Sequence, residues 1–211
     1  MVVLRWLPSV GNDRSHCKYN AVMTLADERG HVIEVADRLF YERGIQAVGM
    51  AELRREVGLP LKKLYTLFPS KQAILFAVLD RRHSTWTEQL QHRIDAAPQP
   101  REKLLAVYDY LSDWFTEDSF RGCAFINAFG ELGSQSPDVA ERTRAHKESF
   151  QQVLGELVAA AGGSPALAPQ LALLAEGAQT TAAISRSAEP ARQAREAAEI
   201  LIDAQLERAA T

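Results

Sequence analysis

The sequence of 211 residues lacks most features of secreted, membrane-spanning and catalytic proteins. Its two cysteines, Cys17 and Cys123, are too few for a disulfide framework and favour a reducing, cytoplasmic setting. No apolar run approaches the roughly 18 residues that a membrane-spanning helix needs, so we expect no membrane partner. The amino-terminal segment carries Arg5 and Pro8 and makes a poor signal peptide.

Signatures of catalysis are also missing. The chain contains no GxSxG, HExxH, GxxxxGK[ST] or GxGxxG motif, and its five histidines are scattered. Glu131 together with His146 or Cys123 does not have the spacing of a metal or nucleophile site. We therefore expect a protein that is not an enzyme and that uses no cofactor and no metal.

Apolar residues recur at helical spacing, and no segment alternates as a strand would, so the sequence predicts an all-α fold. One helix ends at Gly44, short helices cover 50–57 and 60–68, and a long helix runs from Ser70 to Pro98. Further helices are expected over 101–116, 120–132, 137–161, 165–187 and 189–209. The pairs Ser136-Pro137 and Ser164-Pro165 are typical helix starts.

The first residues have no clear period, and Gly11, Asn12 and Asp13 break any helix. We expect residues 1–24 to form a flexible extension. Met23 is an equally good start of the native protein, since the first helix follows it directly.

The stretch from Met50 to Lys71 predicts two short helices around a turn at Gly58, followed by a helix capped by Ser70. Many DNA-binding proteins place the second helix of such a pair in the major groove. From Arg29 to Lys71 there are eight lysines and arginines against five acidic residues, whereas residues 72–211 hold thirteen against nineteen. This asymmetry is expected when only one part of a protein touches phosphates.

The second short helix carries the side chains that a DNA-reading helix needs. Leu64 and Phe68 are spaced to face inward and to set its angle. Lys62 and Lys63 can reach phosphate or guanine, and Tyr65 can donate its hydroxyl to a phosphate. Two further residues extend this face. Leu61 points outward and can contact a thymine methyl, and Lys71 stands at a helix start, which favours anions.

Over about residues 29–80, the chain resembles the TetR family of bacterial transcriptional regulators. The residues that carry the resemblance are Leu39-Phe-Tyr-Glu-Arg-Gly44, Met50-Ala-Glu-Leu53, Val57-Gly-Leu59 and Leu64-Tyr65-x-x-Phe68-Pro-Ser-Lys71. The resemblance implies a three-helix DNA-binding domain at 25–70 and a helical domain at 71–211 that binds an effector and dimerises through its last two helices. The positions it assigns to DNA are Leu61, Lys62, Lys63, Tyr65, Thr66 and Lys71.

Three positions depart from the family pattern. Val48 and Gly49 stand where a capping threonine or serine is frequent, Leu67 replaces a frequent histidine, and Lys63 replaces a frequent threonine. The operator sequence therefore does not carry over from the family. The expected function is a dimeric repressor that a small effector releases from a palindromic operator on double-stranded DNA.

For the effector, we expect a small apolar molecule in a pocket built from aromatic and polar side chains. The candidates are Trp86, Trp114, Phe125, Asn127 and His146. Small residues at helical spacing after Leu171 predict a homodimer face. Two alternatives stay open: a helical protein–protein interaction module without DNA binding, and a thiol-sensing regulator that uses Cys123.

Overall fold

The computed structural model describes residues 24–209, and within this range it contains α-helices and no strands. The helices are α1 Leu25–Arg43, α2 Met50–Val57, α3 Leu61–Leu67, α4 Lys71–Asp95, α5 Pro100–Phe115, α6 Ala124–Leu132, α7 Pro137–Ala160, α8 Leu167–Ser185 and α9 Glu189–Ala209. The all-α prediction is confirmed for this part of the chain. The predicted extension falls outside the described residues except for Thr24.

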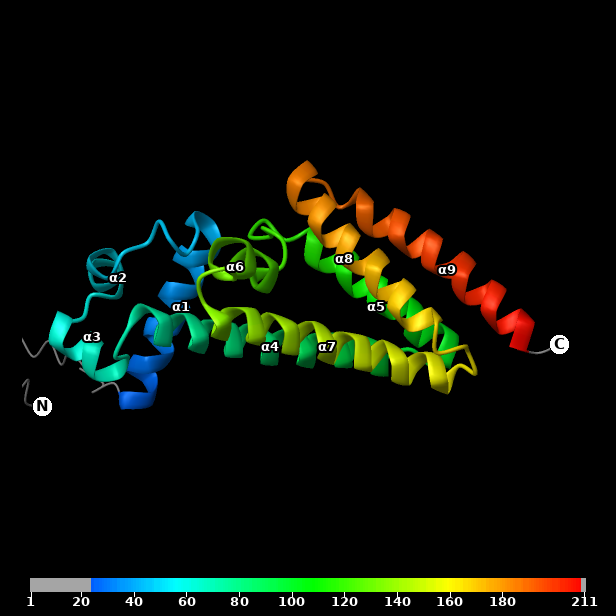
Figure 1. Ribbon diagram of the computed structural model, residues 1–211, viewed down its shortest axis with the longest axis horizontal. Helices are drawn as coiled ribbons and strands as arrows, with labels where there is room; N and C mark the ends of the chain where they lie inside the picture. The colour runs from blue at the N-terminus through cyan, green and yellow to red at the C-terminus, as the bar shows by residue number, and fades with distance from the viewer. Residues whose placement is uncertain (1–23, 210–211) are drawn as a thin grey trace, which may run out of the picture.

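The molecule is elongated, with α1–α3 at one end and α8 and α9 at the other (Figure 1). We call α1–α3 the head and α4–α9 the body. Helix α4 begins beside the head, where it packs against α1, and continues into the body, where it packs against α5. None of the helices in residues 24–209 is long and apolar enough to cross a membrane.

The ends of the head helices follow from local sequence. Thr24 and Asp27 form a reciprocal capping box at the start of α1. Helix α2 starts at Gly49 without a side-chain cap, as the sequence indicates. Gly58 ends α2 at φ 74°, a left-handed conformation that favours glycine. Ser70 accepts a hydrogen bond from the amide of Ala73 (3.1 Å) and so begins α4.

Two helix starts differ from the prediction by two residues or more. Helix α6 begins at Ala124 rather than at residue 120, because Gly122 adopts φ 84° and lies against the side chain of Ala183. Helix α8 begins at Leu167, two residues after Pro165, because the amide of Leu167 bonds to the carbonyl of Ser164 in a turn. By contrast, Pro137 begins α7 as expected, although the Ser136 hydroxyl accepts a hydrogen bond from Gln72 and not from α7.

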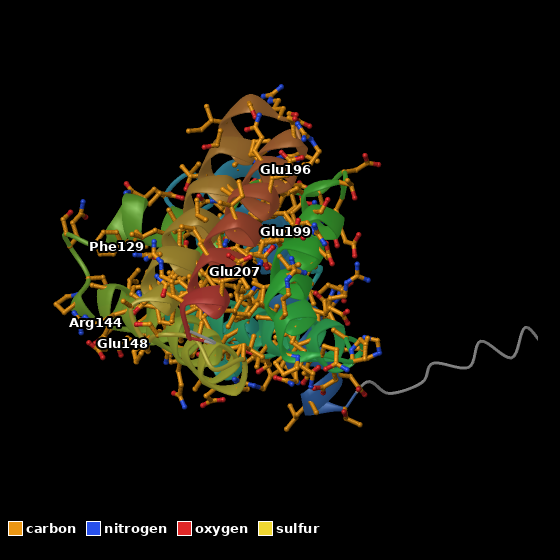
Figure 2. The ribbon with its side chains drawn as sticks, turned by 90° about the vertical axis from the view of Figure 1, so that its right-hand side faces the viewer. Phe129, Arg144, Glu148, Glu196, Glu199 and Glu207 are labelled. Atoms are coloured by element: carbon orange, nitrogen blue, oxygen red, sulfur yellow. The ribbon has the colours of Figure 1, made fainter. Side chains whose placement is uncertain are left out.

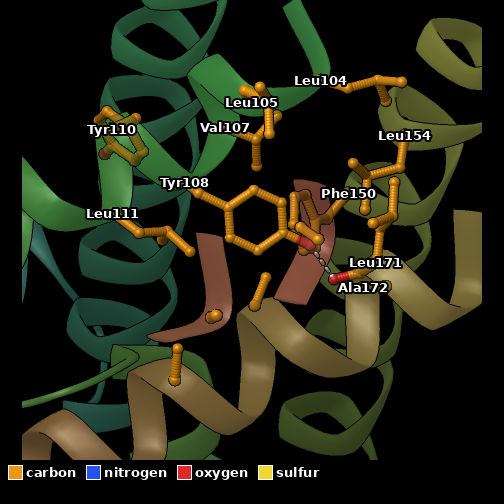
Figure 3. Close-up of a cluster of buried hydrophobic side chains, with 14 of the residues drawn as sticks. Leu104, Leu105, Val107, Tyr108, Tyr110, Leu111, Phe150, Leu154, Leu171 and Ala172 are labelled. Carbon is orange, nitrogen blue, oxygen red and sulfur yellow. Dashed lines mark hydrogen bonds between the residues drawn. The ribbon is translucent and has the colours of Figure 1, made fainter. Parts of the chain in front are cut away.

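The body is built around Tyr108, which is fully buried among side chains of α5, α7 and α8 (Figure 3). Its hydroxyl donates to the carbonyl of Leu171 at 2.7 Å, and burial raises the pKa of Tyr108. Ion pairs hold α9 against α5: Arg101 donates to Asp203 (2.6 Å) and to Glu199 (2.9 Å). Figure 2 shows Glu199 along α9, facing the viewer.

A second core unites the head with part of the body. It contains buried side chains of α1–α3 and the first half of α4, and also Phe125, Ala128 and Val139 from α6 and α7. Burial of such apolar groups contributes about 25 cal/mol per Å². The head therefore packs on α6 as well as on α4, so a shift of α6 would change its contacts with the head. The division into domains at residue 70 stays a prediction, since this core crosses it.

Candidate DNA interface and internal cavity

Helix α3 turns one face to solvent and the other into the head. Leu64 and Phe68 are buried, as their spacing predicts, and Leu67 is buried with them. This inner face fixes the orientation of the helix. The outer face presents Leu61 and Tyr65, each 45% exposed, and with them the exposed residues Lys62 and Thr66.

The residues predicted to contact DNA differ in whether their side chains already have partners within the protein. Lys62 and Tyr65 have no side-chain partner among residues 24–209. Lys63 Nζ lies 2.7 Å from Glu28 Oε2 of α1, a charge contact without hydrogen-bond geometry. The Thr66 hydroxyl donates to the carbonyl of Lys62 (2.9 Å). Lys62 and Tyr65 are therefore the most available polar groups on this face.

Lys71 is only half exposed, because its side chain turns back toward the head. Its Nζ lies 5.8 Å from the centre of the Phe40 ring. Burial lowers the pKa of Lys71, and the nearby carboxylate of Glu131 opposes that shift. Lys71 thus already has intramolecular neighbours at the position where the family resemblance puts a phosphate contact.

Two residues of α1 that sequence reasoning missed position the helix pair. Arg29 donates to the carbonyl of Leu67 and stacks its guanidinium on Phe68 at 4.1 Å. His31 Nε2 lies 3.1 Å from the carbonyl of Val57, at the end of α2. No local signal reveals these contacts, since they join residues 26 to 38 positions apart. They fix α2 and α3 relative to α1.

The head is tied to α6 by polar contacts around Glu131 and Tyr41. The carboxylate of Glu131 accepts hydrogen bonds from the amides of Ile45 (2.9 Å) and Gln46 (2.8 Å), in the turn between α1 and α2. Tyr41 donates its hydroxyl to the carbonyl of Gly122 (2.6 Å) and accepts from the amide of Arg121 (2.9 Å). We call these contacts the head–body link.

A cavity of about 590 Å³ lies between α1 of the head and helices α4–α8 of the body. This volume is within the range of roughly 300–1,000 Å³ typical of small-molecule sites. Its inner wall is formed by buried residues, and its rim by exposed, mostly charged ones. The inner residues include Phe125, His146, Phe150 and Gln179, and the rim includes Glu34, Arg38, Arg81 and Glu117.

Four of the five predicted effector residues line this cavity: Trp86, Trp114, Phe125 and His146. Asn127 does not line it; it is exposed and donates to the carbonyl of Arg121 (3.0 Å). It stands two residues after Phe125, which turns it by about 200° around α6. Asn127 therefore does not face the cavity beside Phe125, and a role for it in effector binding stays a prediction.

His146 is a strongly perturbed titratable group of the cavity. Its ring stacks on Phe125 with centroids 3.9 Å apart, and its Nδ1 lies 2.9 Å from Nδ1 of His83. Burial lowers the pKa of His146 to about 3, with smaller contributions from the charge of Lys147 and from His83. His146 is therefore neutral near pH 7.

Lys147 forms a paired polar group beside the cavity. Its ammonium donates to both carboxylate oxygens of Glu176, at 2.7 and 2.9 Å, and lies 3.4 Å from Cys123 Sγ. Cys123 is buried and lines the cavity. Within the described residues, no cluster of three or more histidine, cysteine, aspartate or glutamate side chains is arranged to hold a metal ion.

The predicted dimer stripe divides into two faces. Leu171, Ala178 and Ala182 of α8, like Ala194 of α9, are buried in the core of this chain. The outward face of the same helices carries exposed large side chains. These are Leu173 (74% exposed), Ile184 (80%) and Ile200 (70%).

Comparison with known families agrees with this arrangement of head and body. Residues 32–78, which contain α2 and α3, match the bacterial regulatory proteins of the tetR family. Residues 100–198 match the tetracyclin repressor-like carboxyl-terminal domain. The chain belongs to the TetR family. Membership points to a transcriptional regulator and not to an enzyme.

Individual relatives in the TetR family are distant. The transcriptional repressor NemR of Escherichia coli is 25% identical over 115 residues, 54% of this chain and 58% of NemR, so the match spans little more than half of that repressor. The E. coli transcriptional regulator YjdC is 28% identical over 167 residues, 76% of this chain and 85% of YjdC.

Among solved structures, the TetR-family regulator SCO4454 of Streptomyces coelicolor superposes with a TM-score of 0.76 at 25% identity. The superposition covers 88% of this chain and 97% of SCO4454. The TetR fold therefore extends over both the head and the body of the protein, including the helices that surround the cavity.

Proposed function

We propose that the protein is a dimeric repressor that binds a palindromic operator through α3 and leaves it when a small effector occupies the cavity. The observation that carries this proposal is the outer face of α3. Lys62 and Tyr65 project there without side-chain partners among residues 24–209, on a helix held from behind by buried Leu64 and Phe68. Such a helix can enter the major groove, with the lysine on phosphate or guanine and the tyrosine hydroxyl on phosphate.

The exposed apolar side chains of α8 and α9 support the dimer. Leu173, Ile184 and Ile200 lie on the outward face of these helices, where a soluble monomer would leave them in water. A twofold pairing through α8 and α9 would cover them with the same residues of a second copy. Two copies of α3 would then meet successive major grooves about 34–36 Å apart.

The position of the cavity supports release by an effector. Helix α1 of the head supplies part of its wall, including Tyr41, whose hydroxyl also belongs to the head–body link. A molecule bound there contacts the head directly and touches α4 at Trp86. Because two heads must fit one duplex together, a shift of a few ångströms in their separation would release the DNA.

The proposal is tested with purified full-length protein and fragmented DNA from its own genome. We expect it to retain a small set of fragments that share a palindrome, and footprinting to show protection centred on it. Retention of no fragment at low ionic strength would contradict DNA binding and favour the protein–protein interaction module. Since NemR is named a repressor, loss of the protein should raise transcription from the retained promoter; a fall would make it an activator.

A thiol-sensing regulator is the second candidate, supported by the ammonium of Lys147 at 3.4 Å from Cys123 Sγ. A nearby positive charge stabilises a thiolate, the form that reacts with oxidants. A Cys123→Ser variant should then keep operator binding but lose release by hydrogen peroxide, whereas Lys147→Met should slow that release. If Cys123→Ser still responds to peroxide, the cysteine is not the sensor.

A further inference from the structure

One polar side chain of the cavity stands apart from the rest. Gln179 of α8 is only 4% exposed, lines the inner wall, and has no hydrogen-bond partner among the described residues. Its amide atoms are not closed off from solvent, since they open onto the cavity that Gln179 lines. A ligand that enters the cavity can therefore bond to them directly. Its NH₂ group can donate to an oxygen of that ligand and its carbonyl can accept.

The charged groups around the inner wall are satisfied by one another. Lys147 is paired with Glu176 at 2.7 Å, and Arg82 is paired with Asp37 of α1. His146 is buried and neutral near pH 7. A ligand that brought a charge into this part of the cavity would lose hydration without gaining a free counter-ion.

Aromatic rings form another part of the cavity wall. Trp86 packs edge-on against His146 (4.9 Å) and Phe150 (5.5 Å), and Trp114 stacks along Tyr110 (6.4 Å). These two groups of rings border the same cavity of about 590 Å³. Flat aromatic walls favour a flat aromatic ligand, through stacked and edge-on contacts that add to apolar burial.

We infer that the cavity binds an uncharged, planar aromatic molecule that carries a hydroxyl or carbonyl oxygen, and that Gln179 is the residue that recognises this oxygen. The inference names the chemical class of the effector and rests on the proposed function for its regulatory meaning. The rings set the shape of the ligand, and the amide selects among ligands of that shape.

Equilibrium dialysis of the full chain without DNA tests the inference with three probes of one ring system: 2-naphthol, naphthalene and 2-naphthoate. We expect 2-naphthol to bind about tenfold more tightly than naphthalene, the factor that one net hydrogen bond supplies. The anion 2-naphthoate should bind more weakly than 2-naphthol by at least this factor. Tighter binding of 2-naphthoate, or no binding of 2-naphthol, would overturn the inference.

The role of Gln179 is tested with Gln179→Leu, which removes the amide and keeps most of the volume. It should weaken 2-naphthol about tenfold and leave naphthalene unchanged. Gln170→Leu, at an exposed position of the same helix α8 that does not line this cavity, is the matched control and should change neither affinity. Equal binding of 2-naphthol by wild type and a folded Gln179→Leu protein would overturn the assignment. If Gln179→Leu does not fold, Gln179→Met replaces it, and the wild-type ranking of the three probes stands on its own.

Failure of this inference is distinguishable from failure of the proposed function. A wild-type protein that binds and releases its operator but rejects 2-naphthol contradicts only the ligand class. A protein that binds 2-naphthol but retains no genomic fragment contradicts only the repressor.

Discussion

Removing the carboxylate of Glu131 should loosen the head from the body. Its two oxygens accept from the amides of Ile45 (2.9 Å) and Gln46 (2.8 Å), and the Gln46 side chain donates to its carbonyl (2.6 Å). A hydrogen bond to a charged group contributes about 1.5–3 kcal/mol when buried. Because Glu131 is only half-buried, each of its two carboxylate hydrogen bonds should contribute at most the lower end of that range, about 1.5 kcal/mol, so Glu131→Ala should cost about 2–3 kcal/mol in total.

Thermal unfolding checks this magnitude. At about 2–4 °C per kcal/mol for a protein of this size, Glu131→Ala should lower Tm by about 4–12 °C. Glu131→Gln keeps one carbonyl acceptor and should lose about half as much. The matched control is Glu148→Ala, an exposed glutamate of α7 that Figure 2 shows projecting from the surface. If Glu131→Ala and Glu148→Ala unfold at the same temperature, the carboxylate of Glu131 does not stabilise the head–body link.

Two further predictions concern titration and assembly. Burial holds the pKa of His146 near 3, below the usual value of about 6.5, so the unfolded chain takes up a proton that the folded chain refuses. The contribution of His146 to the free energy of unfolding is therefore fully present above about pH 6.5, and about 2 kcal/mol of it is lost between pH 7 and pH 5. Urea unfolding across this range should show the loss, and His146→Gln should remove the pH dependence. The same pH dependence in His146→Gln and wild type would contradict a neutral buried imidazole. In sedimentation at micromolar concentration, Ile184→Glu should shift the dimer toward a 23.4 kDa monomer, while Leu25→Glu, at an exposed position of α1, should not. A dimer that tolerates Ile184→Glu would place the interface elsewhere.

What could be predicted from the sequence was local. The spacing of Leu64 and Phe68 set the inner face of α3, and Gly58 set the turn before it, because a helix face and a left-handed turn depend on residues within a few positions. The same periodicity found the helices of the body. It failed at the start of α6, where Gly122 packs against Ala183 from a distant helix.

Most of the contacts that join the head to the body could not be predicted, because they connect residues far apart in the sequence. Glu131 meets Ile45 across 86 positions of sequence, and nothing near either residue indicates the other. The aromatic residues of the cavity were identified by type, but the inner position of Gln179 depends on how α8 packs against its neighbours. Asn127 faces away from the cavity because it lies about 200° from Phe125 around α6, a position that its residue type does not indicate.

The salt dependence of operator binding by wild type and Lys62→Ala tests the central claim most directly. If α3 enters the groove with Lys62 on a phosphate, the variant should bind all sequences more weakly, and the slope of log affinity against log salt should flatten by about one unit for each lysine lost. Lys103→Ala, on α5 of the body, is the control and should keep the wild-type slope. Identical slopes for wild type and Lys62→Ala would contradict the claim that this face of α3 is the DNA-binding surface.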